Sequence, residues 1–145
     1  MSTKAPDNEA VALREITEVW NSGGNLDVIP DLVTDDFTYH NPMVSEPVRG
    51  PDGYRKLAQR FRDAFSDIDM DIKELLVLDD TVTIRYTTRA IHTGEFMGVE
   101  PTQEKIEITG ILINHLEDGK IKDVYVNDDA LGLFKQIGVV EPPER

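Results

Sequence analysis

The sequence has 145 residues, the length of a single domain, and it contains no cysteine. Disulfides, a thiolate metal site and a cysteine nucleophile are therefore excluded. With 28 acidic against 15 basic residues the formal net charge is -13, which disfavours nucleic acid and anionic lipid as partners, because binding phosphate requires clustered Lys and Arg. No apolar run reaches membrane-spanning length, so we predict a soluble, cytoplasmic protein.

The acidic residues are spread along the whole chain, often in adjacent pairs such as Asp79 and Asp80. A solvated surface explains this pattern in the ordinary way. Adaptation to a salt-rich cytoplasm, where dense carboxylates help to keep a protein hydrated, is the sharper hypothesis.

The first part of the chain predicts helices. Asp7 is suited to cap a helix that runs to about Asn21, and apolar residues recur on one face of it, namely Leu13, Ile16 and Trp20. A short second helix is expected over residues 25–32. The clearest helix begins at Pro51, because proline suits the first helical position, and it carries an apolar face formed by Tyr54, Leu57, Ala58, Phe61, Ala64 and Phe65.

An alternating pattern with a period of two dominates the rest of the chain. It predicts strands over residues 37–40, 68–78, 82–92, 104–116 and 121–127. Asp118 and Gly119 are a hairpin signal between the last two strands. A short helix over residues 130–137 follows, and Gly138 is its natural end.

Helices that precede a run of strands indicate the α+β class. We expect a strongly curved antiparallel or mixed sheet wrapped over the N-terminal helices, with a short C-terminal helix. Its open end would leave an apolar pocket. One domain is expected over residues 9–138, with a disordered tail over 1–8 and a loose tail over 139–145.

Asp129 is the main candidate for acid–base chemistry. If the last hairpin turns at Asp118 and Gly119, Asp129 lies opposite Ile108 and shares an apolar face with Tyr125 and Asn127. A carboxylate at the edge of an apolar pocket has its pKa raised by desolvation, which suits a general acid or base. Asp129 also stands where an N-cap of the closing helix would stand. Asp128, of opposite parity, is expected to be a solvated neighbour.

His92 ends a strand face that holds Val82, Ile84 and Tyr86. It would polarise a carbonyl or shuttle a proton near the pocket rim, or else lie at the edge of the core, hydrogen-bonded to backbone. Tyr39 and His40 have opposite parity, so one of them faces inward unless a bulge intervenes. Tyr39 is favoured, and His40 is kept as a rim candidate.

The remaining candidates for substrate binding are apolar or aromatic. Core packing is the ordinary role of such side chains, although core residues also line a pocket of this kind. The full set of substrate-binding candidates is Trp20, Tyr39, His40, Phe61, Phe65, Tyr86, Ile108, Leu112, Tyr125 and Phe134. The three histidines are too scattered to predict a metal site, and no serine has the surroundings of a nucleophile elbow.

Six short stretches of the chain, in this order, carry a family resemblance: YHNP at 39–42, RGPDGY at 49–54, HTGEFMG at 92–98, ITG at 108–110, EDGKI at 117–121 and LGLFKQIG at 131–138. The chain thereby resembles the SnoaL-like polyketide cyclase (ester cyclase) family, which has the nuclear-transport-factor-two-like fold, over roughly residues 9–138.

The resemblance implies a cone-shaped half-barrel, often dimeric through the outer sheet face. It also implies ring closure by intramolecular aldol condensation with no metal or cofactor. An aspartate acts as acid and base in such cyclases, and Asp129 corresponds to it most nearly by position. A tryptophan is frequent four residues before that aspartate, where this chain has Tyr125.

These observations predict a cofactor-independent enzyme for an apolar small molecule that bears a carbonyl group. Asp129 would move a proton at the carbon next to the carbonyl, and His92 or Asn127 would stabilise the enolate oxygen. Isomerisation or dehydration would use the same groups. The alternative is a non-catalytic ligand-binding or scaffold module with the same fold.

Overall fold

The longest helix gives way to the first long strand at Phe65, earlier than residue 68, where the alternating pattern predicted that strand to begin. The computed structural model describes residues 7–139, so most of both predicted tails lies outside the described residues. The helical segments are α1 (Asn8–Glu15), a π-helical turn that continues it (Ile16–Trp20), a 3-10 turn (Leu26–Val28), α2 (Ile29–Leu32), α3 (Gly50–Ala64) and α4 (Ala130–Gln136). The strands are β1 (Val33–His40), β2 (Val48–Arg49), β3 (Phe65–Leu78), β4 (Thr81–His92), β5 (Lys105–Glu117) and β6 (Lys120–Asp128).

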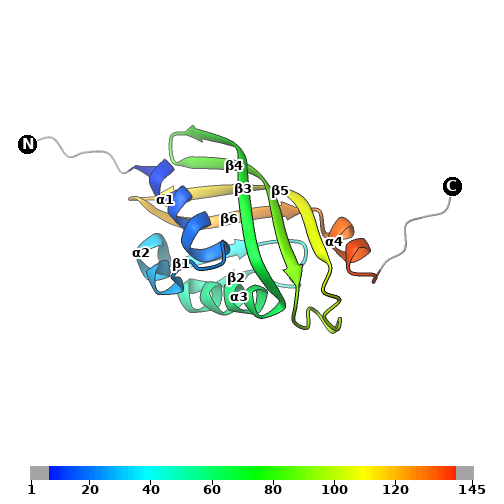
Figure 1. Cartoon of the computed structure of the whole chain (residues 1–145). Coiled ribbons are helices and arrows are strands. Elements are labelled where there is room, and N and C mark those ends of the chain that lie inside the picture. The colour runs from blue at the N-terminus through cyan, green and yellow to red at the C-terminus, as the bar shows by residue number, and fades with distance from the viewer. Residues whose placement is uncertain (1–6, 140–145) are drawn as a thin grey trace, which may run out of the picture.

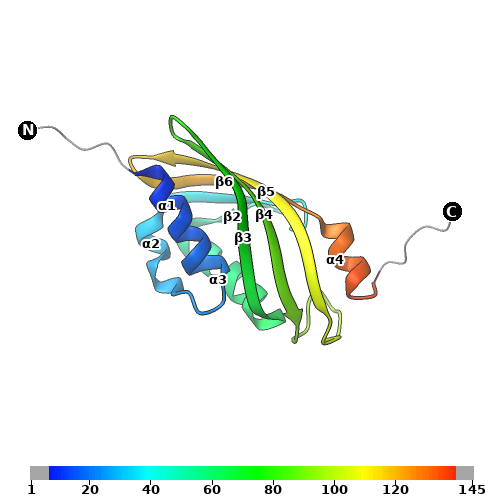
Figure 2. The ribbon, with the colours of Figure 1, turned by 45° about the horizontal axis from the view of Figure 1, so that its top comes forward.

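The described strands form one mixed sheet in the order β2-β1-β6-β5-β4-β3. The pair of β1 and β6 is parallel, and the other neighbours are antiparallel. The long strands curve over α1, α2 and α3, and α4 lies beyond the end of β6 (Figures 1 and 2). The predicted α+β class and curved mixed sheet are confirmed.

The inner face of the sheet follows the predicted alternation. Every second residue of β5 from Ile106 to Leu116 is buried, as are Val82, Ile84 and Tyr86 on β4. These side chains pack against apolar residues of the helices, including Tyr54 of α3. Within residues 7–139, each helix is too short or too polar to cross a membrane.

The buried face of the first helix is shifted from the predicted one: Ile16 is buried and Trp20 packs against the core as predicted, but Leu13 does not. Leu13 is 39% exposed, whereas Ala12, Glu15, Ile16 and Val19 are buried. The buried stripe is therefore centred on positions 12, 15, 16 and 19, which share one helical face at spacings of three and four. A prediction from apolar residues alone leaves out Glu15, which lies within the buried stripe, and therefore points to the neighbouring face.

Arg62 of α3 holds the end of this first helical segment. Its guanidinium donates hydrogen bonds to the carbonyl oxygens of Glu18 at 2.8 Å, Val19 at 3.3 Å and Asn21 at 3.3 Å, and to that of Gly24 at 2.8 Å. A cation at the carboxyl end of a helix also complements the helix dipole. The contact fixes α3 against the π-helical turn that carries Trp20.

Glu15 is fully buried in the core between the first helix and the sheet. Its carboxyl accepts hydrogen bonds from the Tyr54 hydroxyl at 2.7 Å and from Nδ2 of Asn114 at 3.0 Å. Nε1 of Trp20 donates in turn to the Tyr54 hydroxyl at 2.9 Å. Burial raises the pKa of Glu15 from 4.5 to about 7, and the two hydrogen bonds to the carboxyl oppose part of that rise.

Replacing Glu15 by Gln should remove a pH-dependent loss of stability. Because the folded protein binds this proton more tightly than the unfolded chain does, the contribution to stability is fully present below pH 4.5 and is lost as the pH rises through about 7. The raised pKa corresponds to roughly 3 kcal/mol. Urea unfolding of the wild type should therefore show a falling free energy of unfolding between these pH values, and Glu15→Gln should flatten that fall.

Glu9→Gln is the matched control, because Glu9 is an exposed residue of the same helix and its replacement removes the same charge. If the free energy of unfolding fell equally with pH in the wild type and in Glu15→Gln, Glu15 would not be the group that holds the proton.

Candidate functional site

A β-bulge in the last hairpin decides which acidic side chain of β6 faces the core. Beside the turn, Leu116 pairs with Ile121 as the hairpin signal predicts, but the pairing then shifts by one residue, so that His115 pairs with Asp123 and Gly110 with Asp128. Because neighbouring strand residues point to opposite faces, a shift of one residue turns the whole strand over.

The predicted inward position of Asp129 is therefore wrong. Asp129 is exposed and caps α4, with Oδ1 accepting a hydrogen bond from the backbone N–H of Gly132 at 2.8 Å. A side chain on Gly132 would collide with this cap, since its Cβ would lie 2.1 Å from Oδ2 of Asp129. Asp128, predicted to be a solvated neighbour, lines the cavity instead.

The cavity has a volume of about 80 Å3 and lies between the inner face of the sheet, the first helical segment, α3 and α4. Its walls are mostly apolar, and Asp128 is the one carboxylate among the described residues that line it. The lining includes seven of the predicted substrate-binding residues, namely Trp20, Tyr39, Phe61, Phe65, Tyr86, Ile108 and Leu112.

Asp128 is held from two sides. The Tyr86 hydroxyl donates to its Oδ1, and Nδ2 of Asn41 donates to its Oδ2 at 3.2 Å. Nδ2 of Asn41 also donates to the Tyr39 hydroxyl at 2.9 Å. The amide orientation of Asn41 is fixed, because its Oδ1 accepts the backbone N–H of Met43 at 2.9 Å.

Gly110 makes this contact possible. Tyr86, Gly110 and Asp128 are aligned across β4, β5 and β6, so the Tyr86 side chain reaches over the glycine to the carboxylate. A Cβ on Gly110 would lie 2.5 Å from the Tyr86 hydroxyl oxygen and 2.6 Å from Oδ1 of Asp128. Any larger residue at position 110 would push the two groups apart.

Burial raises the pKa of the Asp128 carboxyl above its usual range, while the hydrogen bonds from Tyr86 and Asn41 act in the opposite direction. Burial, followed by the charge of Asp128, likewise raises the pKa of the Tyr39 and Tyr86 hydroxyls. Both phenols therefore keep their protons at neutral pH. The Tyr86 hydroxyl uses its proton in the hydrogen bond to Asp128, whereas the Tyr39 hydroxyl accepts from Asn41.

The structure places several other predicted site residues away from the cavity. Tyr125 and Asn127 are exposed on the outer face of the sheet, where the Tyr125 ring stacks on His40 with ring centroids 4.3 Å apart. The bulge explains both outward positions. Phe134 packs against Phe96 with ring centroids 6.5 Å apart, beside the cavity wall formed by Leu133.

His92 is fully buried but does not line the cavity. Its Nδ1 accepts the backbone N–H of Thr102 at 3.2 Å and lies 3.0 Å from the Thr102 hydroxyl oxygen. Because Nδ1 is an acceptor, the ring proton resides on Nε2. The histidine thus ties the loop between β4 and β5 to the end of β4, the core-edge arrangement that the sequence left open.

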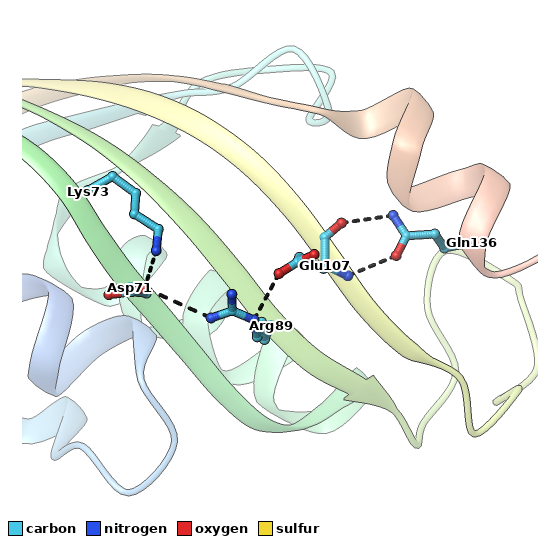
Figure 3. A network of polar contacts seen from close by, with 5 residues as sticks. All are labelled: Asp71, Lys73, Arg89, Glu107 and Gln136. Atoms are coloured by element: carbon cyan, nitrogen blue, oxygen red, sulfur yellow. Dashed lines mark hydrogen bonds and ion pairs between the residues drawn. The ribbon is translucent and has the colours of Figure 1, made fainter.

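Gln136 positions α4 against the cavity. β6 ends opposite Gly110, so the earlier part of β5 has no β6 neighbour, and the Gln136 side chain takes that place (Figure 3). Its amide accepts the N–H of Glu107 at 2.8 Å and donates to the Glu107 carbonyl at 2.9 Å. On the outer face, the Glu107 carboxylate pairs with Arg89 at 2.8 Å, and Arg89 lies 3.9 Å from Asp71.

Sequence reasoning missed Asp128, Asn41 and Gly110 as site residues. Asn41 and Gly110 both fall within stretches that carry the family resemblance, so those stretches contained the signal. Among residues 7–139, no three His, Asp or Glu side chains are grouped so as to hold a metal ion.

A model of the SnoaL-like polyketide cyclase family matches residues 10–137. The chain belongs to this family. A comparison with curated proteins found no match. Three solved structures illustrate the relation of this SnoaL-like protein to others.

The first is a proposed SnoaL-like polyketide cyclase from Jannaschia sp. CCS1, with a TM-score of 0.85, 20% identity and coverage of 99% of this chain and 100% of that one. The second is AclR from Streptomyces galilaeus, described as a proposed hydroxylase, with a TM-score of 0.81, 24% identity and coverage of 96% and 85%. The third is a proposed polyketide cyclase from Bacillus cereus ATCC 10987, with a TM-score of 0.73, 32% identity and coverage of 90% and 79%.

Tyr86→Phe should raise the pKa of Asp128. The variant removes a hydrogen bond that stabilises the ionised carboxylate, while the ring continues to bury it. The measurement is an NMR titration of the Asp128 side-chain carboxyl carbon. Tyr125→Phe, at an exposed tyrosine on the opposite face of the sheet, is the control and should leave the titration unchanged. A pKa that stays the same or falls in Tyr86→Phe would contradict the geometry described above.

Proposed function

We propose that the protein is a cofactor-independent acid–base enzyme for a small apolar molecule that bears a carbonyl group, with Asp128 as the acid–base residue. The observation that carries this proposal is a single carboxylate at the wall of an apolar cavity, partly buried and with a raised pKa. A carboxyl group with its pKa raised toward neutral pH is suited to both accept and return a proton. Membership of the SnoaL-like family supports the same reading.

In the proposed mechanism, Asp128 removes a proton from the carbon next to the substrate carbonyl. Negative charge then develops on the carbonyl oxygen, and the Tyr39 hydroxyl donates a hydrogen bond to it. The Tyr39 oxygen accepts from Asn41, and its own proton has no acceptor among residues 7–139. Tyr39 thereby replaces His92 and Asn127 in the role expected from the sequence.

For an aldol ring closure, the enolate carbon would attack a second carbonyl of the same molecule to form the new carbon–carbon bond. Asp128 would then return its proton to the resulting alkoxide, so that no net proton is gained or lost. Isomerisation would use the same group to return the proton at another carbon. Dehydration would use it to protonate a departing hydroxyl.

A non-catalytic ligand-binding module is the second candidate. The observation that favours it is that both oxygens of Asp128 already accept hydrogen bonds, as those of a structural carboxylate do. The two candidates differ in whether Asp128 exchanges a proton with a bound molecule.

Asp128→Asn tests the acid–base role. The assay is exchange of deuterium from solvent into the carbon next to the carbonyl of neutral β-keto esters, read by NMR, which requires no knowledge of the final product. The exchange rate should fall by roughly 100-fold or more, the range for loss of a general base, while binding is retained. Asp129→Asn is the control, because Asn caps helices as well as Asp does. Equal exchange by the wild type and Asp128→Asn would remove Asp128 from the mechanism.

We also propose that the protein forms a homodimer through the outer sheet face. Apolar side chains are exposed there on neighbouring strands: Ile111 is 47%, Ile113 is 36% and Tyr125 is 47% exposed. Ile113 pairs with Tyr125 across β5 and β6, which makes the patch continuous. A buried interface would remove these side chains from water. The cytoplasmic location and the adaptation to salt stay predictions from composition.

Ile113→Lys should convert the dimer to a monomer, because it would place a charge at the centre of the interface. Sedimentation velocity measures the change. Val139→Lys, at a residue that is 50% exposed near the end of the described chain, is the control. A wild-type monomer, or a dimer that persists in Ile113→Lys, would contradict this interface.

A further inference from the structure

Phe61 lines a second hollow besides the cavity that contains Asp128, which is called the inner cavity below. This outer cleft has a volume of about 830 Å3 and lies between the segment 43–48, α3 and the loop that joins β4 to β5. Its apolar surface includes Val44, Leu57 and Phe96. The mechanism proposed above uses none of it.

Phe61 is the residue that lines both hollows. Its ring centroid is 5.7 Å from that of Trp20, which lines the inner cavity, and 5.6 Å from that of Phe96, which lines the outer cleft. The side chain is only partly buried, unlike Tyr54 and Leu57 on the same helix. One aromatic ring thus borders both the carboxylate site and a much larger space.

The inner cavity is too small for a whole substrate of the proposed class. An engineered protein cavity that takes up benzene measures about 150 Å3, and the inner cavity measures about 80 Å3. With Phe61 in its present position it therefore has room for a carbonyl group and its adjacent carbon atoms but not for the whole molecule.

We propose that the inner cavity and the outer cleft are two parts of one binding site, separated by Phe61, and that the substrate is an elongated molecule. Its carbonyl end would lie at Asp128 and its apolar body in the outer cleft, with Phe61 turned aside. This inference rests on the proposed function for the carbonyl end only. Phe61 then determines specificity, because its position sets how long or bulky a molecule can reach Asp128.

The charges around the outer cleft restrict the body of the substrate further. Three exposed acidic side chains, Glu46, Asp63 and Glu95, line the cleft together with one basic side chain, Arg60. The rim is therefore negative on balance and would repel a carboxylate or phosphate. The inferred substrate has a neutral or positively charged body.

Binding of neutral methyl β-keto esters with alkyl chains from propyl to decyl tests the inference. Trp20 is the only tryptophan of the chain and lines the inner cavity, so its fluorescence reports occupancy. Affinity should rise by roughly threefold to fourfold for each methylene buried in the cleft. A chain of equal length that ends in a carboxylate should bind more weakly than its methyl-terminated counterpart.

Substitutions in the protein show where the alkyl chain of the ester binds. Met97→Glu places a charge in the outer cleft at a residue that is 63% exposed, so the fold should be retained, and it should weaken binding of long esters but not of short ones. Leu131→Glu is the matched control, because Leu131 is 54% exposed, lies outside the cleft and receives the same charge. Phe61→Leu should favour branched and bulky esters over the straight chains that the wild type prefers.

Affinity that is independent of chain length, or equal effects of Met97→Glu and Leu131→Glu on long esters, would overturn the two-part site. Neither result bears on deuterium exchange, which tests Asp128 alone. Chain-length dependence without any exchange would support the two-part site and contradict the enzymatic function.

Discussion

The β-bulge at the start of β6 is the constraint on which the site depends. It places one extra residue, Lys122, in β6 opposite the step from His115 to Leu116 in β5, and every later side chain of β6 changes face. Val124, Val126 and Asp128 thereby face the core. The same shift leaves Asp129 outside, where it caps α4. The two adjacent aspartates therefore have different roles. Asp129 caps α4, and α4 supplies Leu133 to the cavity that Asp128 lines.

Keeping a carboxylate in an apolar wall requires nearby donors, because an unpaired buried charge is strongly destabilising. β4 provides the Tyr86 hydroxyl, and the end of β1 leads to Asn41, so the donors come from elements far apart in sequence. Gly110 weakens β5 locally, since glycine has no side chain to pack, but its missing side chain is what brings Tyr86 and Asp128 together. The donors are strong enough to hold the carboxylate, yet burial still dominates and keeps its pKa raised.

The buried carboxyls of Glu15 and Asp128 differ in one respect that matters for chemistry. Glu15 is enclosed by Tyr54 and Asn114 and touches neither hollow, so its proton can affect stability but cannot reach a ligand. Asp128 borders empty space. Burial raises the pKa of the Tyr39 hydroxyl, and the charges of Asp128 and Glu15 raise it further. A phenol held in this way remains a hydrogen-bond donor throughout the physiological pH range, as stabilisation of an enolate oxygen would require.

The sequence predicted the parts of the site that depend on local pattern and failed where pairing across strands decides. Alternation along β4 and β5 was sufficient to turn Tyr86, Ile108 and Leu112 inward, because long strands with one apolar face have one favourable orientation. No such pattern distinguishes Asp128 from Asp129. Which of the two aspartates faces the core depends on the extra residue near the turn. The residues before them do not help, because Tyr125 and Val126 are both acceptable on either face of a strand. An acidic pair at the end of a hairpin therefore has two assignments that differ by one residue, and only the pairing of β5 with β6 chooses between them.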